Sequence, residues 1–169
     1  MRPTELDLIF APITSLAGIG EKTADLIRRI VAVDTTGREV RAADLLFVPP
    51  NAVIDRTSRP GIAHSGESSI VTLELTVDRH QPPPRGRGAV PYRVFAFDDT
   101  GEITLTFFHA KGPWLEKLMP VGGEIIVSGK VEWFNGRPSM VHPDHVVAKA
   151  DAASLPLIEP VYPMTAGLS

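Results

Sequence analysis

Apolar and polar residues alternate along the second half of the chain, whereas earlier apolar residues recur with a helical period. From Ile70 onward the alternation predicts short strands, because successive side chains of a strand point to opposite faces. Five strands are expected, at residues 70–77, 92–97, 103–108, 124–132 and 140–147.

Two tight turns join neighbouring strands in this series. Asp98-Asp99-Thr100-Gly101 lies between the second and third strands, and Asn135-Gly136 lies between the fourth and fifth. Glycine accepts the positive φ that such turns need, so each pair is expected to be antiparallel. Between the third and fourth strands, residues 113–118 begin with proline and are followed by Pro120, which predicts one short helix.

Three strands, a helix and two further strands in about 80 residues is the order of the five-stranded Greek-key barrel called the OB-fold. A five-stranded SH3-like barrel is the nearest alternative, but it would not ordinarily place a helix after the third strand. The predicted fold class is mainly β with a small α part: an OB-fold barrel preceded by a short N-terminal helical region.

The chain before the strands carries two helical patterns. Residues 21–31 place Ala24 and Ile27 on one face, which predicts a helix. A shorter helix is expected after Pro3, and Pro12 limits its length because proline interrupts a helix interior.

The end of the chain differs from the rest. It contains no basic residue after position 149 and has three closely spaced prolines at 156, 160 and 163, which prevent a helix and a central strand. We therefore expect three parts: a helical region and connector in residues 1–65, the barrel in residues 66–149, and a proline-rich extended linker in residues 150–169.

Composition excludes several functional classes. The 17 Lys and Arg against 20 Asp and Glu give a net charge of −3, so any nucleic-acid binding must come from a local patch. The absence of cysteine excludes disulfides, thiol catalysis, iron–sulfur clusters and the common structural zinc sites. No uninterrupted apolar run approaches about 18 residues, so neither secretion nor membrane insertion is indicated, and a cytoplasmic location is expected.

The sequence shows no enzymatic signature. Gly129-Lys130 is followed by valine and lacks the upstream glycine of a nucleotide-binding loop, and no hydrolase elbow occurs. His142-Pro143-Asp144-His145 offers metal-ligand types, but a spacing of three on a strand sends the histidines to opposite faces, and no second cluster exists. No catalytic, cofactor-binding or metal site is therefore predicted, and these side chains are expected to form hydrogen bonds at the end of the last strand.

Arginines gather between the first two barrel strands. From residue 79 to residue 97 there are four arginines and no acid: Arg79, Arg85, Arg87 and Arg93. The loop joining those strands is one of the places where OB-folds contact nucleic acid, and the planar guanidinium donates two bonds to a phosphate. These arginines are interpreted as DNA contacts. The alternative is a solvated loop whose arginines serve only solubility.

Aromatic residues end the third strand. Alternation forces Phe107 and Phe108 to opposite faces, so one ring fills the barrel while the other is exposed or covered by another element. An exposed ring can stack on a base, and Lys111 and Trp114 follow closely. Trp133 and Phe134 raise the same question; for them, packing in the core or between elements is expected.

A glycine turn precedes the second predicted helix. Gly18-Ile19-Gly20 followed by Glu21-Lys22 resembles a helix-hairpin-helix, in which the backbone approaches a DNA phosphate and Lys22 could supply a charge. A glycine turn that joins two packed helices without DNA contact is the alternative.

Taken together, these segments resemble part of the RecG family of bacterial ATP-dependent DNA helicases. The match is carried by Asp98-Asp99-Thr100-Gly101 and by residues 14–20, 44–50, 54–56, 105–109, 141–144 and 159–163, in order and with fitting spacing. The resemblance covers nearly the whole chain and implies the N-terminal OB-fold wedge domain. In that family the wedge splits the strands of a stalled replication fork or Holliday junction.

The resemblance also implies partners and roles. The motor domains that hydrolyse ATP with Mg²⁺ are expected to follow this sequence in the full-length protein, so no cofactor is expected here. Phe108 would stack on the base at the branch point and the arginine-bearing loop would guide a template strand. Gly112 falls near the place of the family's second stacking aromatic, and Trp114 lies two residues on.

These observations predict a module that binds branched DNA and contacts neither a membrane nor a substrate for catalysis. The alternative is a protein-docking module in which Trp133, Phe134 and the proline-rich tail contact a partner domain without preference for branched DNA. An enzyme acting on its own is not expected, although the full-length parent resembles a DNA helicase.

Overall fold

The computed structural model describes residues 3–31, 37–84 and 90–168, which form two compact units. The first unit comprises residues 1–53 and 160–169, and the second comprises residues 54–159. The boundaries predicted at residues 65 and 149 rest on composition and periodicity and stay a prediction. No helix in the described ranges is both long enough and apolar enough to cross a membrane.

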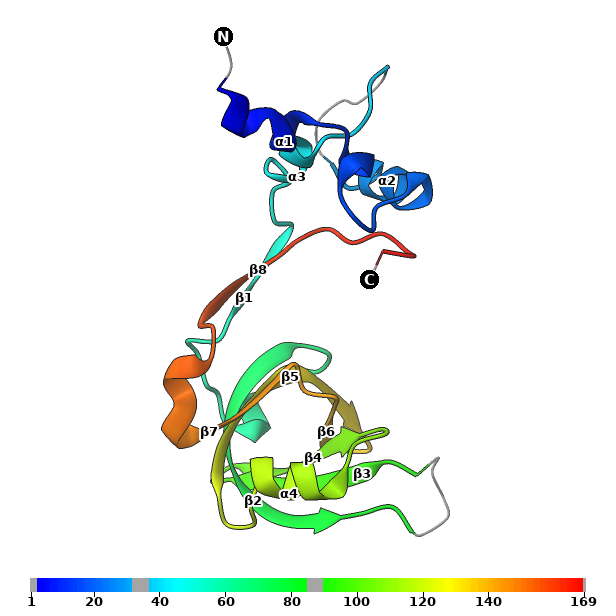
Figure 1. The fold of residues 1–169 in the computed structure, drawn as a ribbon. Coiled ribbons are helices and arrows are strands. Elements are labelled where there is room, and N and C mark those ends of the chain that lie inside the picture. The colour runs from blue at the N-terminus through cyan, green and yellow to red at the C-terminus, as the bar shows by residue number, and fades with distance from the viewer. Residues whose placement is uncertain (1–2, 32–36, 85–89, 169) are drawn as a thin grey trace. The chain divides into compact units, whose positions relative to one another are not determined.

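The second unit is built around a closed β-barrel (Figure 1). Strand β2 pairs with β3, β3 with β4, β4 with β6, β6 with β5, and β5 pairs again with β2. The β4–β6 pairing is parallel and the other four are antiparallel, so both predicted hairpins are confirmed. The bounds are β2 (Ile70–Gln81), β3 (Tyr92–Asp98), β4 (Gly101–Phe107), β5 (Glu124–Phe134) and β6 (Arg137–Val141). This barrel, with a helix between its third and fourth strands, confirms the predicted OB-fold.

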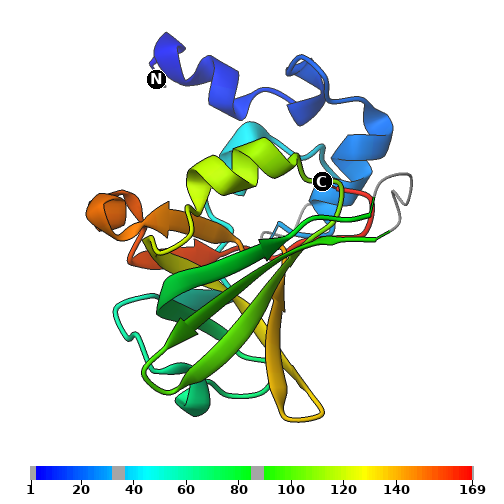
Figure 2. The same cartoon turned by 90° about the horizontal axis from the view of Figure 1, so that it is seen from below.

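The barrel interior is a continuous apolar core. Its members come from alternate positions of the five strands, as expected for side chains that point to one face: Leu73, Leu75, Val77, Val94, Ala96, Ile103, Leu105, Ile125, Val127, Val131 and Met140. Helix α4 (Gly112–Leu118) adds Leu115, and Met119 follows it. Figure 2 shows α4 at the end of the barrel opposite the β3–β4 and β5–β6 hairpins.

The last predicted strand, at residues 140–147, is wrong in detail because it is two strands. Both β6 and β7 (His145–Ala148) pair with β5. Met140 lies opposite Val131, and Ala148 lies opposite Ile125. The segment from Met140 to Ala148 advances eight positions while β5 advances six, so it contains two extra residues. The two extra residues fall between β6 and β7. There Pro143 has no N–H to donate to the ladder, and His142 before it has a positive φ.

The first barrel strand is longer than predicted and contains a bulge. Val77 lies opposite Ala96, whereas Arg79 lies opposite Phe95, so Asp78 is an extra residue in β2. The strand continues to Gln81. The expectation that Arg79 belongs to the loop is therefore wrong, because Arg79 lies on β2. Arg93 lies on β3, as the predicted strand at residues 92–97 requires.

The first unit is helical, as predicted, with several short elements. They are the 3₁₀ turns Thr4–Leu6 and Ile13–Ser15 and the helices α1 (Asp7–Phe10), α2 (Glu21–Arg28) and α3 (Ala42–Leu45). Ile13, Ala24, Ile27 and Val40 form its buried core. Gly18 has a φ of 85°, a conformation that favours glycine and turns the chain just before α2 begins.

Two short strands were not predicted. Strand β1 (Ala52–Asp55) pairs with β8 (Ile158–Val161) in a two-stranded sheet. Pro160 within β8 is compatible with a strand that has a single neighbour, because only one edge must supply ladder hydrogen bonds. The expected extended linker also contains the 3₁₀ segment Lys149–Ser154, so it is more structured than the proline content suggested. A further 3₁₀ turn, Ile62–His64, precedes β2.

Candidate nucleic-acid interface

The outer face of β3 and β4 carries a mixed row of cationic, aromatic and hydroxyl side chains. Opposite residues of an antiparallel pair point to the same side of the sheet. Arg93 lies opposite Thr106, and Phe95 lies opposite Thr104. Because Val94 between them is fully buried, this row faces away from the core. Strand β3 therefore presents an arginine and a ring to the outside.

The bulge in β2 brings a second arginine to the same face. Without the extra residue Asp78, strict alternation would continue the inward row that ends at Val77 and send Arg79 into the core. With it, Arg79 lies opposite Phe95, and its guanidinium carbon sits 4.1 Å from the centroid of that ring. Arg79 also forms an ion pair with Asp78. The guanidinium and the ring thus form one stacked unit on the barrel surface.

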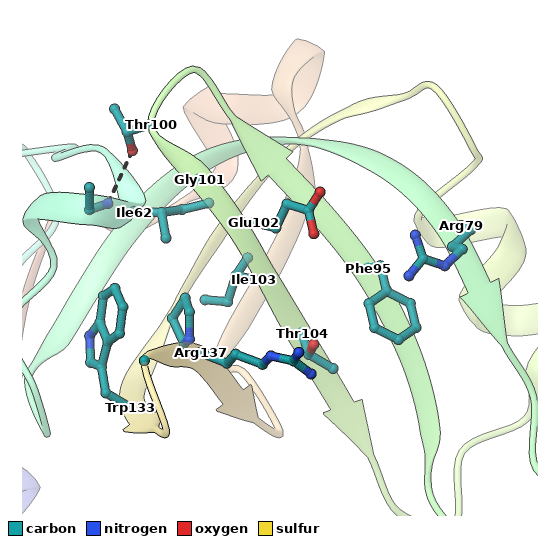
Figure 3. Close-up of a pocket in the computed structure, with 13 residues that line it drawn as sticks. Ile62, Arg79, Phe95, Thr100, Gly101, Glu102, Ile103, Thr104, Trp133 and Arg137 are labelled. Atoms are coloured by element: carbon teal, nitrogen blue, oxygen red, sulfur yellow. Dashed lines mark hydrogen bonds between the residues drawn. The ribbon is translucent and has the colours of Figure 1, made fainter.

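A cavity of about 560 Å³ opens beside this stacked unit (Figure 3). It is bounded by the β3–β4 hairpin, by the β5–β6 hairpin and by the turn before β2. Figure 3 shows Trp133 and Phe95 on opposite sides of the cavity, with the Arg137 side chain extended between them. The other labelled lining residues are Ile62, Arg79, Thr100, Gly101, Glu102, Ile103 and Thr104.

The β3–β4 hairpin is held in place by one carboxylate. Asp98 accepts hydrogen bonds from the Thr100 hydroxyl, from the backbone N–H groups of Thr100 and Gly101, and from that of Ile62. Burial alone would raise the pKa of Asp98, but these four donors outweigh it and the pKa is lowered. The turn at residues 98–101 therefore also holds Ile62, which precedes β2, at the rim of the cavity.

Phe108 follows β4 at the other end of the barrel. Phe107 is buried in the core, whereas Phe108 is 42% exposed, so the predicted separation of the two rings is confirmed. The backbone N–H of Phe108 donates to Nε2 of His142 over 3.1 Å, and the two rings lie 5.8 Å apart at a tilt of 32°. The expected hydrogen bonding by the histidine motif is confirmed for His142, which backs the exposed ring on one side.

Helix α4 is fastened to the barrel by a short polar chain. His80 bonds the carbonyl oxygen of Met119 through Nε2 over 2.7 Å, and because a carbonyl only accepts, Nε2 carries the proton. Nδ1 of His80 lies 3.1 Å from the Tyr92 hydroxyl oxygen, and that hydroxyl donates its single proton to Glu116 of α4 over 3.2 Å. Burial, together with the nearby Glu116 carboxylate, raises the pKa of Tyr92. Trp114, 56% exposed on this helix, is thus carried on a fixed element.

The remaining predicted residues lie in different places. Lys111 is exposed and immediately precedes α4, whereas Lys22 is exposed on α2 in the first unit. Arg85 and Arg87 lie outside the described residues. Nε2 of His145 lies 3.6 Å from the Glu159 carboxylate, and no group of three metal-ligating side chains occurs in the described ranges.

Sequence reasoning did not single out Phe95, Glu102 or Arg137, which line the cavity. The alternation in β3 and β4 already placed Phe95 and Glu102 on one face of the sheet. The neighbourhood of Arg137 could not be read locally, because it depends on the parallel pairing of β6 with β4. Trp133 was expected to pack against the core, and it does so while also lining the cavity. Phe134, expected to pack as well, is instead 76% exposed.

Comparison with known proteins concerns the sequence and fold of the chain as a whole. No protein-family model matches the chain. The ATP-dependent DNA helicase RecG of Aquifex aeolicus (strain VF5) is 28% identical over 157 residues, which is 93% of this chain. The chain is a relative of RecG. The resemblance seen in the sequence is thereby confirmed.

A solved structure of RecG has the same fold over almost the whole chain. That structure shows RecG bound to a three-way DNA junction; it covers 95% of this chain with a TM-score of 0.56 and 19% identity. A chain of a replication protein A heterotrimer bound to single-stranded DNA covers 50% of this chain with 16% identity and a TM-score of 0.37.

The similarity involves a small part of RecG. This chain spans 18% of the length of the Aquifex protein and 21% of the chain in the junction complex. It therefore corresponds to the OB-fold region of RecG and not to the part of that helicase that makes up most of its length.

Proposed function

We propose that this chain binds branched DNA, such as a stalled fork or a Holliday junction, and acts as the wedge that parts its strands. The observation that carries the proposal is the exposed ring of Phe108, held by His142 at the end of a closed barrel. A flat apolar side chain in a fixed position offers a surface on which a base at the branch point stacks. Stacking of this kind contributes about 1–3 kcal/mol per base and tolerates any sequence.

The barrel and its arginines supply the rest of the proposed mechanism. A rigid closed sheet excludes the duplex, while the ring caps the last base pair and offsets part of the roughly 1.4 kcal/mol lost for each opened step. Arg79 and Arg93 on the outer face, and Arg85 and Arg87 between them in the sequence, donate to the phosphates of the separated strands. Lys111 and Trp114 lie next to Phe108 in the sequence and extend the same contact, whereas a DNA contact by Lys22 would be made by the first unit.

In this proposal the motor domains of the full-length protein hydrolyse ATP and pull the duplex. The wedge itself performs no covalent chemistry, which agrees with a site made of rings and guanidinium groups. Its contribution is positional, because the two strands can separate only where the duplex meets the barrel.

A titration of forked and linear DNA tests the proposal. The chain is expected to bind a fork more tightly than a linear duplex of equal length. Phe108→Ala should weaken fork binding about 5- to 100-fold, from the loss of one stacked base. Phe134→Ala is the matched control, since it removes an exposed ring at the other end of the barrel and should leave the fork preference unchanged. Equal affinity of the wild type and Phe108→Ala for the fork would overturn the assignment.

Docking of a partner protein is the second candidate function. It is favoured by exposed apolar side chains in the first unit, among them Leu8, Leu46 and Phe47. Retention by an immobilised motor domain, with equal affinity for forked and linear DNA, would support this function over DNA binding. Loss of retention in Leu46→Ser and Phe47→Ser, with the fold intact, would assign the contact to this surface.

A further inference from the structure

The cavity on the outer face of the barrel is not explained by stacking at Phe108. It is lined by residues of the β3–β4 and β5–β6 hairpins, whereas Phe108 follows the other end of β4. Its volume of about 560 Å³ lies within the range of about 300–1,000 Å³ that is typical of small-ligand sites. A single flat ring system with its sugar is of a size that such a cavity accepts.

Two walls of the cavity suit a flat aromatic ligand. On one side, the guanidinium of Arg79 is stacked on Phe95, 4.1 Å from the ring centroid. On the other side, Trp133 is partly buried and packs against the barrel core, which anchors it. Nucleobases stack both on aromatic rings and on guanidinium planes, so the cavity offers a base two apolar or cationic surfaces.

Two charged residues give the cavity its hydrogen-bonding character. Thr104 lies beside Ser139 in the parallel β4–β6 pair, so Glu102 and Arg137, each two residues earlier, occupy neighbouring positions. Neither forms an ion pair or a side-chain hydrogen bond with another described residue. The cavity therefore presents one carboxylate acceptor and one guanidinium fork, both available to a ligand.

We infer that this cavity binds an unpaired guanine of a DNA single strand through Glu102 and Arg137. Guanine presents two acceptors, O6 and N7, which match the paired N–H donors of the Arg137 guanidinium. It also has an amino group that can donate to the Glu102 carboxylate. Thymine has no amino group and offers the guanidinium a single acceptor on its major-groove edge. The inference rests on the proposed function, since the unpaired base is supplied by a strand that the wedge has separated.

The distance from Phe108 to the cavity fits a continuous strand. Phe108 lies six positions after Glu102 along the chain. Six steps of an extended strand correspond to about 20 Å at roughly 3.3 Å per residue. A stacked single strand covers that distance with about six nucleotides at roughly 3.4 Å each. This length lies within the site sizes of about 4–16 nucleotides per OB-fold. A strand stacked at Phe108 can therefore reach the cavity along Arg93 and Thr106 of the same face.

The test compares two single strands that differ only in base identity. The chain is titrated with a twelve-nucleotide oligothymidylate and with the same strand carrying guanine at three adjacent central positions. The wild type is expected to bind the guanine strand about tenfold more tightly. The ratio of the affinity for the guanine strand to the affinity for oligothymidylate is the guanine-to-thymine ratio. Glu102→Gln and Arg137→Gln should each bring this ratio close to one, because each removes one of the two base contacts. Glu132→Gln, which changes an exposed acid outside the cavity, should leave the ratio unchanged.

A second pair of variants separates stacking from base recognition. Phe95→Leu should weaken binding of both strands by a similar factor, because stacking does not depend on base identity, whereas Phe97→Leu on the same strand should change neither. A ratio of one in the wild type would overturn the inference. So would a ratio that persists in both Glu102→Gln and Arg137→Gln, or deoxyguanosine monophosphate binding as tightly as the guanine strand.

Fork binding distinguishes this inference from the proposed function. Phe108→Ala should weaken fork binding and keep the guanine-to-thymine ratio, whereas Glu102→Gln should lose the ratio and keep the fork preference on a fork that lacks guanine. Failure of the first result contradicts the wedge role of Phe108. Failure of the second contradicts guanine recognition in the cavity and leaves the wedge role intact.

Discussion

The guanidinium of Arg56 donates from Nη2 to the Glu159 carboxylate over 2.6 Å, although Arg56 is fully buried. Its other donors are also used: Nε bonds the Ser128 hydroxyl at 2.9 Å, and Nη1 bonds the carbonyl oxygen of Pro156 at 3.1 Å. One side chain thus joins the residue after β1, the middle of β5 and the start of β8. The hydrogen bond from Arg56 lowers the pKa of Glu159, with a smaller contribution from His145.

Replacement of Arg56 by lysine is expected to destabilise the second unit strongly. An ammonium group cannot reproduce a planar fork that serves three acceptors in different directions. Arg56→Lys should lower the free energy of unfolding by about 1–3 kcal/mol, because a lysine in this buried position leaves at least one of the three acceptors without its hydrogen bond. Urea unfolding followed by tryptophan fluorescence measures this, because both tryptophans, Trp114 and Trp133, lie in that unit. Arg137→Lys, at an exposed position, is the control and should change stability by less than about 0.5 kcal/mol.

Asp98 is expected to make the stability of the barrel depend on acid pH. Its pKa is lowered in the folded state, so its contribution is present at neutral pH and is lost as the pH falls through that lowered value, below about 4. Asp98→Asn should therefore cost about 1–3 kcal/mol at pH 7. The difference from the wild type should shrink towards pH 2. A constant difference across this range, measured by urea unfolding, would contradict the assignment, and Asp144→Asn at an exposed position serves as the control.

Gly129 is expected to be essential to the close packing at the break between β6 and β7. A Cβ at this position would lie 2.8 Å from Sδ of Met140 and 3.1 Å from Cα of Pro143. The methionine can move, but the backbone at Pro143 must shift as well. Gly129→Ala should therefore destabilise the second unit by about 1–3 kcal/mol. Thermal unfolding of both variants measures the difference: Gly101→Ala, whose Cβ would be 3.5 Å from its nearest neighbour, should cost clearly less than Gly129→Ala.

Arg93 is expected to contribute to DNA binding through a phosphate and not through a base. The logarithm of the binding constant falls linearly with the logarithm of the salt concentration, with a slope set by the number of phosphates contacted. Arg93→Gln should reduce that slope by about one and weaken binding uniformly across sequences. Fork titrations between about 50 and 200 mM salt measure the slope. An unchanged slope would remove Arg93 from the interface, and Lys130→Gln, which loses an exposed charge paired with Glu132, is the matched control.

Local patterns in the sequence determined the barrel. Alternation identified the five strands, glycine-containing turns identified the two hairpins, and a proline at its start identified α4. These features are local because backbone dihedral preferences and side-chain alternation act over a few residues. The opposite fates of Phe107 and Phe108 followed from the same rule, since consecutive strand residues cannot share a face.

Pairings between distant residues decided the rest. A one-residue bulge at Asp78 turned Arg79 outward onto Phe95, and no local pattern marks where a ladder accommodates an extra residue. The parallel pairing of β6 with β4 brought Arg137 beside Glu102, although they are far apart in the sequence. The buried Arg56 found its acceptors about 70 to 100 residues away. In each case the free energy that selects the arrangement comes from contacts formed only when the barrel closes, so the sequence alone determined the strands and the tertiary structure decided which side chains share a site.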